Sequence, residues 1–412
     1  MNSAFGGSEK IWINAQIATM SPQVKNPYGL LEDHALGVKN GKIAFIAPMQ
    51  DIDISTFRGK IIDAQNNYLT PGLIDSHTHL IYGGERSREF NQRLNGATYE
   101  EISRSGGGIL ATVSATRSLS EEELVEQARP RLEALINEGV TTVEIKSGYG
   151  LTLQDELKML RAAKKLVAEY PISLRTTLLA AHAVPPEYTK AADNYIDLIC
   201  KEMIPQVADE GLAEAVDVFC EKIGFSPDQS EKIFVAAQKA GLGIKVHAEQ
   251  LSNSHGAELA ARYSAWSVDH LEYLDETGIQ ALKKSATVAT LLPGAFYFLG
   301  ETKKPPIELL RKYQVPMALA SDLNPGSCPL ASLRLMLNMG CVLFALTPEE
   351  ALQGTTRNAA IALGLGDSTG TLQIGKTADM LLWDIDDPAQ LAYQFGTNVL
   401  RQRIFAGESS DA

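Results

Sequence analysis

The chain has 412 residues, of which 45% are hydrophobic and 21% are charged. This composition is typical of a globular protein and excludes a disordered or collagen-like chain. Lys and Arg number 37 against 50 Asp and Glu, which gives a net charge of −13. Because so acidic a body repels phosphate backbones, we expect no nucleic-acid partner.

The cysteine pattern and the hydropathy indicate the cellular setting. The chain has four cysteines, which are widely spaced and form no CxxC pair. A disulfide scaffold is therefore not expected, and a reducing cytoplasmic location is predicted. No apolar run of about 18 residues occurs, so we expect neither a signal peptide nor a membrane partner. The cysteines are Cys200, Cys220, Cys328 and Cys341.

Both ends of the chain have the pattern of short strands. Residues 10 to about 67 contain β-prone stretches and a hairpin signal, Asn40-Gly41. The stretches are Lys10–Thr19, Ala35–Val38 and Lys42–Ala47. The C-terminal part has the same character, so the two termini can together form one small β-domain. Its expected strands are Gly370–Leu372, Ala378–Asp384 and Arg403–Ala406.

The long middle part alternates between strand and helix patterns. Eight β-rich runs can be counted: Leu73–His79, Thr141–Ile145, Leu174–His182, Ala215–Glu221, Gly243–His247, Ala265–His270, Thr287–Leu292 and Pro316–Ser321. Helices are predicted at Ser120–Asn137, Thr152–Glu169, Ser230–Ala240, Ser254–Ala261, Thr277–Lys284 and Pro306–Tyr313. Ser120 and Glu123 form a capping-box pattern. Eight such units predict a closed parallel barrel. The competing fold is an open doubly wound sheet, but no predicted strand of this chain is followed by the glycine-rich phosphate-binding motif typical of that fold.

Five of the seven histidines stand at the carboxyl ends of predicted strands: His77, His79, His182, His247 and His270. In a parallel barrel these ends meet on one face, where active sites are built. His77 and His79 are two residues apart, so both can point into the barrel mouth and bind one cation. Imidazole is a good ligand for zinc, iron or nickel. A lone pair of this kind can also be a turn or core feature, but the other histidines favour a metal site.

Two carboxylates follow other strands. Asp322 follows the eighth predicted strand, where it can complete a ligand set and take a proton from water. The alternative is a turn or cap residue, since Asn324 and Pro325 come next. Glu221 ends the fourth strand and could bridge a second metal. We expect one metal ion, with Glu221 outside its ligand set.

Two further side chains stand on loops after strands. Arg86 presents a planar fork that suits a carboxylate, although a surface salt bridge is an equal alternative. Tyr149 lies between Gly148 and Gly150, so it can either reach a ligand or cap its loop.

The run Thr70–His79, with sequence TPGLIDSHTH, resembles the first barrel strand of the amidohydrolase superfamily. That likeness covers nearly the whole chain. It implies a metal-dependent hydrolase with a (β/α)8 TIM barrel and a small β-sandwich built from both termini. The implied domains are residues 1–67 and 361–412 for the sandwich and 68–360 for the barrel.

A narrower resemblance is carried by five motifs on separate predicted strand ends. They are similar to those of the imidazolonepropionase family: Glu144–Leu151, Ala181–Tyr188, Val246–Ser252, Val268–Leu274 and Ser321–Ser327. The likeness implies hydrolysis of the ring amide of 4-imidazolone-5-propanoate to N-formimidoyl-L-glutamate in histidine degradation. It also implies one zinc or iron ion and a homodimer.

The same resemblance implies the roles of individual residues. The metal ligands would be His77, His79, His247 and Asp322. Substrate contacts would come from Arg86, Tyr149 and His182, and the opened product would be held by Asn324, Gly326 and Ser327. Asp322 and His270 would be catalytic, with Asp322 taking the proton. His182 and His270 would donate hydrogen bonds to the oxyanion.

Position 250 departs from part of the family, because Gln250 stands where related deaminases carry Glu. An amide can bind substrate but cannot shuttle a proton, which argues against a cytosine- or adenosine-type deaminase. Two alternatives remain. One is another cyclic amidase or an aromatic deaminase on the same scaffold, which release of ammonia would reveal. The other is a catalytically silent scaffold, which a metal-replete but inert protein would reveal.

Overall fold

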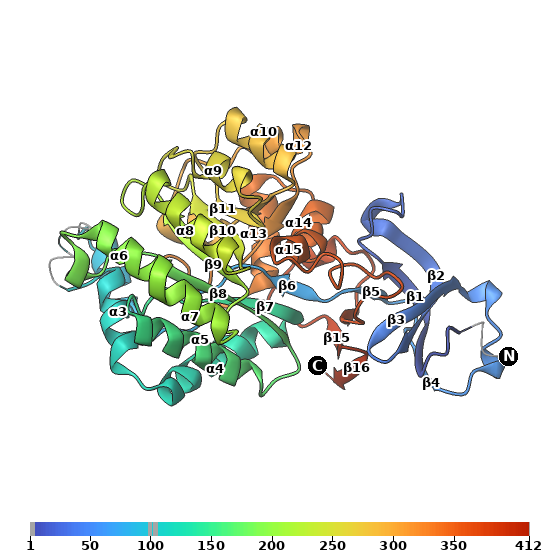
Figure 1. The fold of residues 1–412 in the computed structure, drawn as a ribbon. Coiled ribbons are helices and arrows are strands. Elements are labelled where there is room, and N and C mark those ends of the chain that lie inside the picture. Colours follow the sequence, from blue (N-terminus) through green and yellow to red (C-terminus); the bar gives the residue numbers. More distant parts are fainter. Residues whose placement is uncertain (1–4, 98–100, 102–105, 412) are drawn as a thin grey trace.

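The structure is a computed structural model that describes residues 5–97, 101 and 106–411. Figure 1 shows two bodies, a helix-covered barrel and a separate sheet in which the first and last parts of the chain lie together. The predicted barrel and the predicted β-unit from both termini are thereby confirmed.

The barrel is an eight-stranded parallel sheet in which the strands follow one another in chain order. All eight predicted strands are confirmed, with bounds that differ by a few residues. They are β6 (Leu73–Asp75), β7 (Val140–Lys146), β8 (Ser173–Ala181), β9 (Ala215–Cys220), β10 (Gly243–Ala248), β11 (Ser267–His270), β12 (Val288–Leu291) and β13 (Met317–Leu319).

The loops after the first and last strands close the barrel. Thr78 and Leu323 form a parallel bridge, and the Leu323 carbonyl accepts the backbone N–H of His79 at 2.9 Å. The backbone N–H of Asp322 donates to the carbonyl of His77 at 3.0 Å. Closure therefore brings the histidine pair of the first strand beside the aspartate of the last.

Helices cover the outside of the barrel (Figure 1). The six predicted helices are confirmed as α4 (Glu121–Asn137), α5 (Leu153–Val167), α8 (Pro227–Lys239), α9 (Gly256–Arg262), α10 (Glu276–Ser285) and α12 (Ile307–Lys312). Helices that the sequence analysis did not predict are α1 (Ser87–Leu94), α3 (Ile109–Ser118), α6 (Ala192–Leu198), η5 (Ile199–Met203), α7 (Ile204–Asp209), α11 (Pro293–Leu299), α13 (Leu333–Phe344), α14 (Pro348–Gly354), α15 (Arg357–Ala362) and α16 (Gln390–Tyr393). Short turns of helix are η1 (Pro27–Gly29), η2 (Met49–Asp51), η3 (Ile54–Thr56) and η4 (Pro186–Tyr188).

Helix α15 closes the end of the barrel opposite the histidines. Ala359 and Ala360 pack against Ile74 of β6, and Ala362 packs against Val288 at the start of β12. Small alanines let the helix approach the strand ends closely, so this end of the barrel is filled and the open face is the one at the carboxyl ends.

The second sheet joins the two ends of the chain. Its strands are β1 (Lys10–Ala18), β2 (Leu30–Lys39), β3 (Lys42–Pro48), β4 (Lys60–Asp63), β5 (Tyr68–Pro71), β14 (Met380–Trp383), β15 (Leu400–Phe405) and β16 (Glu408–Asp411). The order is β16-β15-β14-β5-β1-β2-β3, with β4 paired to β1. The link between the termini is the antiparallel pair β5 and β14, where the Trp383 indole donates to the Thr70 hydroxyl at 2.8 Å.

One predicted strand is wrong. Gly370–Leu372 has no strand structure, because Gly370 has a φ of 84° that turns the chain. Leu372 is buried against the terminal sheet and its N–H donates to the Thr19 carbonyl at 2.9 Å. The apolar residue was therefore a correct sign of burial, but the backbone is a turn.

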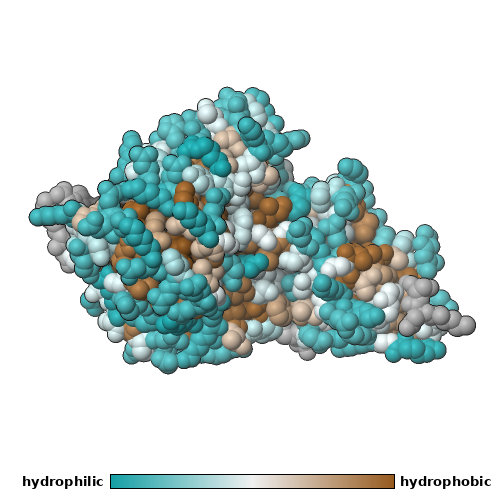
Figure 2. Space-filling view, viewed as in Figure 1, coloured by the Kyte–Doolittle hydropathy of each residue, from teal (hydrophilic) through white to brown (hydrophobic). Residues whose placement is uncertain are grey.

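The exterior is mainly polar. Figure 2 shows hydrophilic residues over most of the face in view, with hydrophobic ones visible in patches between them. Within the described residues, no helix combines the length and the hydropathy that crossing a bilayer requires.

The predicted cap of α4 allows a stability test. Ser120 accepts the N–H of Glu123 at 3.2 Å, and Glu123 accepts the N–H of Ser120 at 2.8 Å. We expect Ser120→Ala to lower the free energy of unfolding by about 1 kcal/mol, measured by denaturant titration. Ser118→Ala is the control, since the exposed Ser118 bonds only within its own helical turn. Equal effects of the two substitutions would contradict the capping role.

Candidate active site

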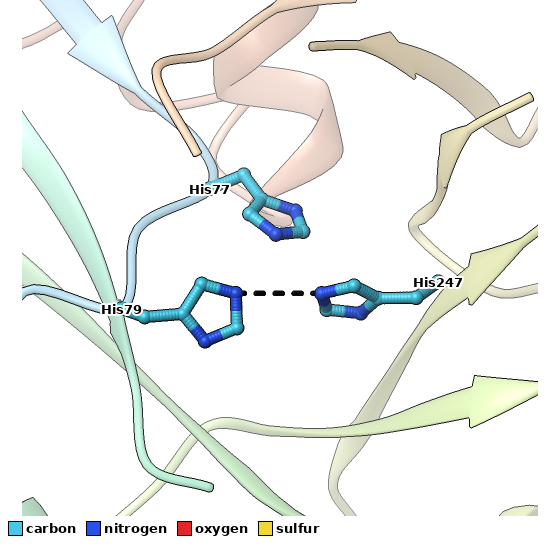
Figure 3. A group of neighbouring side chains, drawn as sticks. All are labelled: His77, His79 and His247. Carbon is cyan, nitrogen blue, oxygen red and sulfur yellow. Dashed lines mark hydrogen bonds between the residues drawn. The ribbon is translucent and has the colours of Figure 1, made fainter. Parts of the chain in front are cut away.

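Three histidine rings converge at the carboxyl ends of the barrel strands. His77 and His79 lie in the loop after β6, and His247 lies on β10. Figure 3 shows the rings around one shared space. Their ligating nitrogens lie within 4.8 Å of one another, and the Nε2 atoms of His79 and His247 are 3.4 Å apart. All three residues are buried. His77 and His79, the pair whose spacing predicted a metal site, therefore lie beside a third imidazole.

Two buried carboxylates fix the orientation of two of these rings, those of His77 and His247. Asp269 on β11 lies 2.6 Å from the Nδ1 of His77, and Asp217 on β9 lies 3.0 Å from the Nδ1 of His247. A carboxylate accepts hydrogen bonds, so each Nδ1 carries the hydrogen and each Nε2 presents its lone pair to the shared space. Burial holds the pKa of His247 well below its ordinary value. The ring is thus neutral, as a metal ligand must be.

Asp322 adds the fourth group. Its Oδ1 lies 3.4 Å from the Nε2 of His77 and 3.5 Å from the Nε2 of His79. Burial by itself would raise the pKa of Asp322, but the approach of the two imidazoles holds it well below the usual range. The site therefore presents an ionised carboxylate beside the neutral rings of His79 and His247, while Asp269 and Asp322 raise the pKa of His77 in spite of its burial.

This donor set fits a divalent transition-metal ion. Lone pairs on facing Nε2 atoms repel one another unless a cation or proton lies between them, and the Nε2 of His77 has no hydrogen-bond partner among the described residues. Three imidazoles and a carboxylate are the donors that zinc and similar ions take.

His270 ends β11 beside this cluster. Its ring centroid is 5.4 Å from that of His247, and its Nδ1 has no hydrogen-bond partner among the residues that the structure describes. Burial lowers the pKa of His270 to about 4, so the ring is neutral at pH 7. Both His270, with a φ of 86°, and Asp322, with a φ of 52°, have left-handed backbones. Such strain concentrates at functional sites.

The contacts of His182 differ from the expected role. Its Nδ1 lies 3.0 Å from the carbonyl oxygen of Gly148, which can only accept a hydrogen bond. The ring stacks on His79 with centroids 5.2 Å apart, and burial lowers its pKa to about 3. A neutral ring with its hydrogen on Nδ1 has an acceptor at Nε2. The Nε2 of His182 can therefore accept a hydrogen bond but not donate one, which differs from the expected donation to an oxyanion.

A cavity of about 580 Å³ opens beside the histidines. This is the size and the mixed lining expected for a small-molecule site. Six of the seven expected substrate residues line it: Arg86, Tyr149, His182, Asn324, Gly326 and Ser327. Gln250, the seventh, lies partly buried in the loop after β10 and is not among the lining residues. Phe90, Phe219 and Phe298 supply apolar walls that the sequence analysis did not predict.

Arg86 is engaged on one side. Its Nε and Nη2 bind the Glu89 carboxylate at 2.8 and 2.7 Å, so the salt bridge considered as an alternative does form. The third nitrogen, Nη1, faces the loop after the last strand, because a Cβ at Gly326 would lie 2.3 Å from it. Glu89 thus orients the guanidinium, while Nη1 stays on the cavity side.

The loop after β13 is held by one amide side chain. Asn324 accepts the N–H groups of Gly326 and Ser327 at 2.8 and 2.7 Å, and it donates to the Asp322 carbonyl at 2.6 Å. A turn or cap role was the alternative considered for Asp322. Asn324 makes this turn instead, so the Asp322 carboxylate can face the histidines.

Glu221 lies outside the ligand set. Its Oε1 accepts the N–H of Leu251 at 2.9 Å, and its Oε2 accepts the hydroxyl of Ser252 at 2.6 Å. It is not part of the group formed by His77, His79 and His247.

A group of buried charges beneath the histidines was missed. Asp217, Asp269, Glu144, Lys146 and Lys245 all lie on barrel strands and are fully buried. The available signal was the presence of charges inside strands that otherwise read as apolar, such as Glu144 and Lys146, which are two residues apart, and Lys245, two residues before His247. A charge in such a run must find a partner across the barrel.

Comparison with known proteins identifies the family. The model of the amidohydrolase family matches residues 68–410. A protein of Hahella chejuensis named imidazolonepropionase is 58% identical over 397 residues, covering 96% of this chain and 98% of the relative. One of Chromobacterium violaceum with the same name is 56% identical over 407 residues, covering 99% and 98%. The chain belongs to the imidazolonepropionases.

Solved structures support the fold. A triazine hydrolase from an Arthrobacter species has a TM-score of 0.75 at 16% identity, covering 97% of this chain and 94% of that one. An adenosine deaminase from Xanthomonas campestris has a TM-score of 0.69 at 17% identity, covering 98% and 92%. Membership of the imidazolonepropionases and the amidohydrolase fold confirm the expectation of a metal-dependent hydrolase.

Proposed function

We propose that this chain hydrolyses the ring amide C–N bond of 4-imidazolone-5-propanoate to give N-formimidoyl-L-glutamate, the imidazolonepropionase step of histidine degradation. The observation that carries the proposal is the convergence of three imidazoles and Asp322 beside a cavity lined by the expected substrate residues. Relatives that are 55–58% identical over nearly the whole chain support the same reaction.

One zinc or iron ion, held by His77, His79, His247 and Asp322, completes the site in this proposal. When bound, such an ion lowers the pKa of water from 15.7 towards about 7 and polarises a carbonyl group. The ligand geometry supports one ion, since Glu221 is engaged by the loop after β10.

Asp322 and His270 are the proposed catalytic residues. Asp322 is ionised, so it accepts the proton of the attacking water and later delivers a proton to the departing ring nitrogen. His270 is neutral with an unpartnered Nδ1, so it donates one hydrogen bond to the oxyanion that forms at the ring carbonyl.

The other residues bind and orient the substrate. Nη1 of Arg86 pairs with the propionate, which fixes the ring over the histidines. The Nε2 of His182 accepts a ring N–H, as its bond to Gly148 requires. Tyr149, whose pKa burial raises, stays a neutral hydroxyl that can donate to the substrate.

The loop after β13 supplies the contacts to the product. Asn324, Gly326 and Ser327 hold the opened chain, and Gln250 positions the substrate without moving a proton. The amide at position 250 disfavours a cytosine- or adenosine-type deaminase, and the similar proteins of Hahella chejuensis and Chromobacterium violaceum are named imidazolonepropionase.

Several wider predictions accompany this function. The net charge of −13 supports the absence of a nucleic-acid partner. The homodimer, the cytoplasmic location, the absence of a membrane partner and the domain limits at residues 1–67, 68–360 and 361–412 stay predictions.

Metal removal tests the proposal as a whole. Freshly generated imidazolonepropionate should be consumed by the purified protein, followed by its ultraviolet absorbance. Chelation should abolish turnover, and added Zn²⁺ or Fe²⁺ should restore it at close to one ion per chain. A protein inert with its full complement of metal would refute the proposal, and two ions per chain would reopen Glu221 as a bridge. Ammonia release would instead select a deaminase.

Asp322→Asn tests the proton transfer. Because an amide cannot accept the proton, kcat should fall by roughly 10²–10⁴-fold. Metal content of the variant must be measured alongside, since Asp322 is also a proposed ligand. Turnover near the wild-type rate with metal bound would remove Asp322 as the base. Glu221→Gln, another buried carboxylate near the site, is the control that should retain one ion.

Arg86→Ala tests the propionate contact. Loss of the guanidinium should chiefly raise KM, by roughly tenfold or more, since an ionic hydrogen bond contributes about 1.5–3 kcal/mol. Steady-state kinetics measure the effect. Arg93→Ala is the control, because Arg93 lines the same cavity but stacks on Phe90 and Phe298. An unchanged KM in Arg86→Ala would contradict the contact.

A further inference from the structure

The two carboxylates behind the histidines rest on buried lysines. Lys146 on β7 places its Nζ 2.7 Å from Oδ2 of Asp217 and 2.9 Å from Oε1 of Glu144. The other oxygen of Asp217, Oδ1, accepts both the ring N–H and the backbone N–H of His247. Asp217 is thus held between a lysine on one side and a histidine on the other.

The second carboxylate lies in the same network. Oδ2 of Asp269 is 2.6 Å from His77 and 4.0 Å from the Nζ of Lys146. Lys146 therefore stands between the carboxylates that orient His77 and His247. Lys146 and its three carboxylate neighbours, Glu144, Asp217 and Asp269, are fully screened from solvent.

Lys245 provides an internal comparison. It is equally buried and has the same charge, with Nζ 3.6 Å from Asp269 and 3.8 Å from Glu144. Its hydrogen bonds, however, go to the Ser267 hydroxyl at 2.9 Å and to the carbonyls of Ser76 at 3.1 Å and Ala362 at 3.4 Å, and the Ser267 hydroxyl donates to Oδ1 of Asp269 at 2.6 Å. Lys245 thus acts on Asp269 through its charge and through Ser267, whereas the direct lysine bond to Asp217, which holds His247, comes from Lys146.

We propose that Lys146 is a positioning residue that sets the metal affinity of the site by holding Asp217, and through it the Nδ1–H tautomer of His247. The inference rests on the proposed metal site. Charge alone would act in the opposite direction, because removing a buried cation favours binding of another cation. Weaker metal binding after loss of Lys146 would therefore report lost orientation.

The test compares two substitutions of equal charge. Lys146→Met should raise the Kd for Zn²⁺ by roughly 10–100-fold, the range found when partners of metal ligands are removed. Lys245→Met should change the Kd by less than about threefold. Competition with a chromophoric chelator measures both, and thermal melts of the apoproteins report folding separately. Equal Kd values for Lys146→Met and wild type, or equal weakening in both variants, would overturn the proposal.

A charge-paired variant covers the case in which Lys146→Met does not fold, since an unpaired buried carboxylate is strongly destabilising. Lys146→Met combined with Glu144→Gln removes one charge of each sign, so it should fold but still bind Zn²⁺ weakly. Glu144→Gln alone keeps the lysine bond to Asp217 and should bind Zn²⁺ more tightly than the paired variant. Equal Kd values for these two variants would also overturn the proposal.

A spectroscopic readout separates positioning from general structure. In ¹⁵N-histidine-labelled apoprotein, the wild type should show His247 protonated at Nδ1, and the paired variant should show a mixture of tautomers. An unchanged tautomer would count against the role of Lys146. If wild-type protein itself binds no Zn²⁺, the proposed metal site fails; if wild type binds and the variants bind equally, only the role of Lys146 fails.

Discussion

Imidazole lone pairs that face one another away from water need their hydrogens held on the opposite nitrogens. Here Asp269 and Asp217 meet that need by accepting the Nδ1–H groups of His77 and His247. Without them either tautomer could form, and an Nε2–H would point into the shared space and block a cation. The tautomers that leave Nε2 open to a metal therefore depend on these two carboxylates. Asp217 lies on β9, next to the strand of His247, and Asp269 lies on β11, across the barrel from β6, which precedes His77.

The barrel supplies these carboxylates because its strands are parallel and in register. In the ladder between β9 and β10, Asp217 is the partner of Lys245, which puts its side chain two positions before His247 along the strand direction. Closure between the loops of β6 and β13 then adds Asp322 to the same space. Small shifts in register would move these groups to the outer face, since alternate residues of a strand point to opposite sides. The fold and the chemistry are thus fixed by the same hydrogen bonds.

The sequence was sufficient for much of this arrangement, for identifiable reasons. Strand ends carrying His77, His79, His247 and Asp322 could be located because apolar β-rich runs are locally readable and all eight ends of a parallel barrel share one face. The tautomer of His182 could not be predicted in this way, since the bond between His182 and the Gly148 carbonyl depends on how two loops meet. Nor could the pairing of Arg86 with Glu89, because it forms only when α1 does. Gly370 misled the strand prediction since a positive φ leaves no mark in a hydrophobic pattern.

The barrel interior has more negative than positive groups, and this excess favours the binding of a cation at the histidines. Glu144, Asp217 and Asp269 outnumber Lys146 and Lys245, and Asp322 adds a further carboxylate on the open side. Buried charge of one sign is costly unless something neutralises it. Lys146 and Lys245 neutralise part of this negative charge on the side away from the cavity. The remaining negative charge lies at the histidines, where the cavity admits a small molecule. A cation bound at that point would stabilise the interior and at the same time be the group that the substrate meets first.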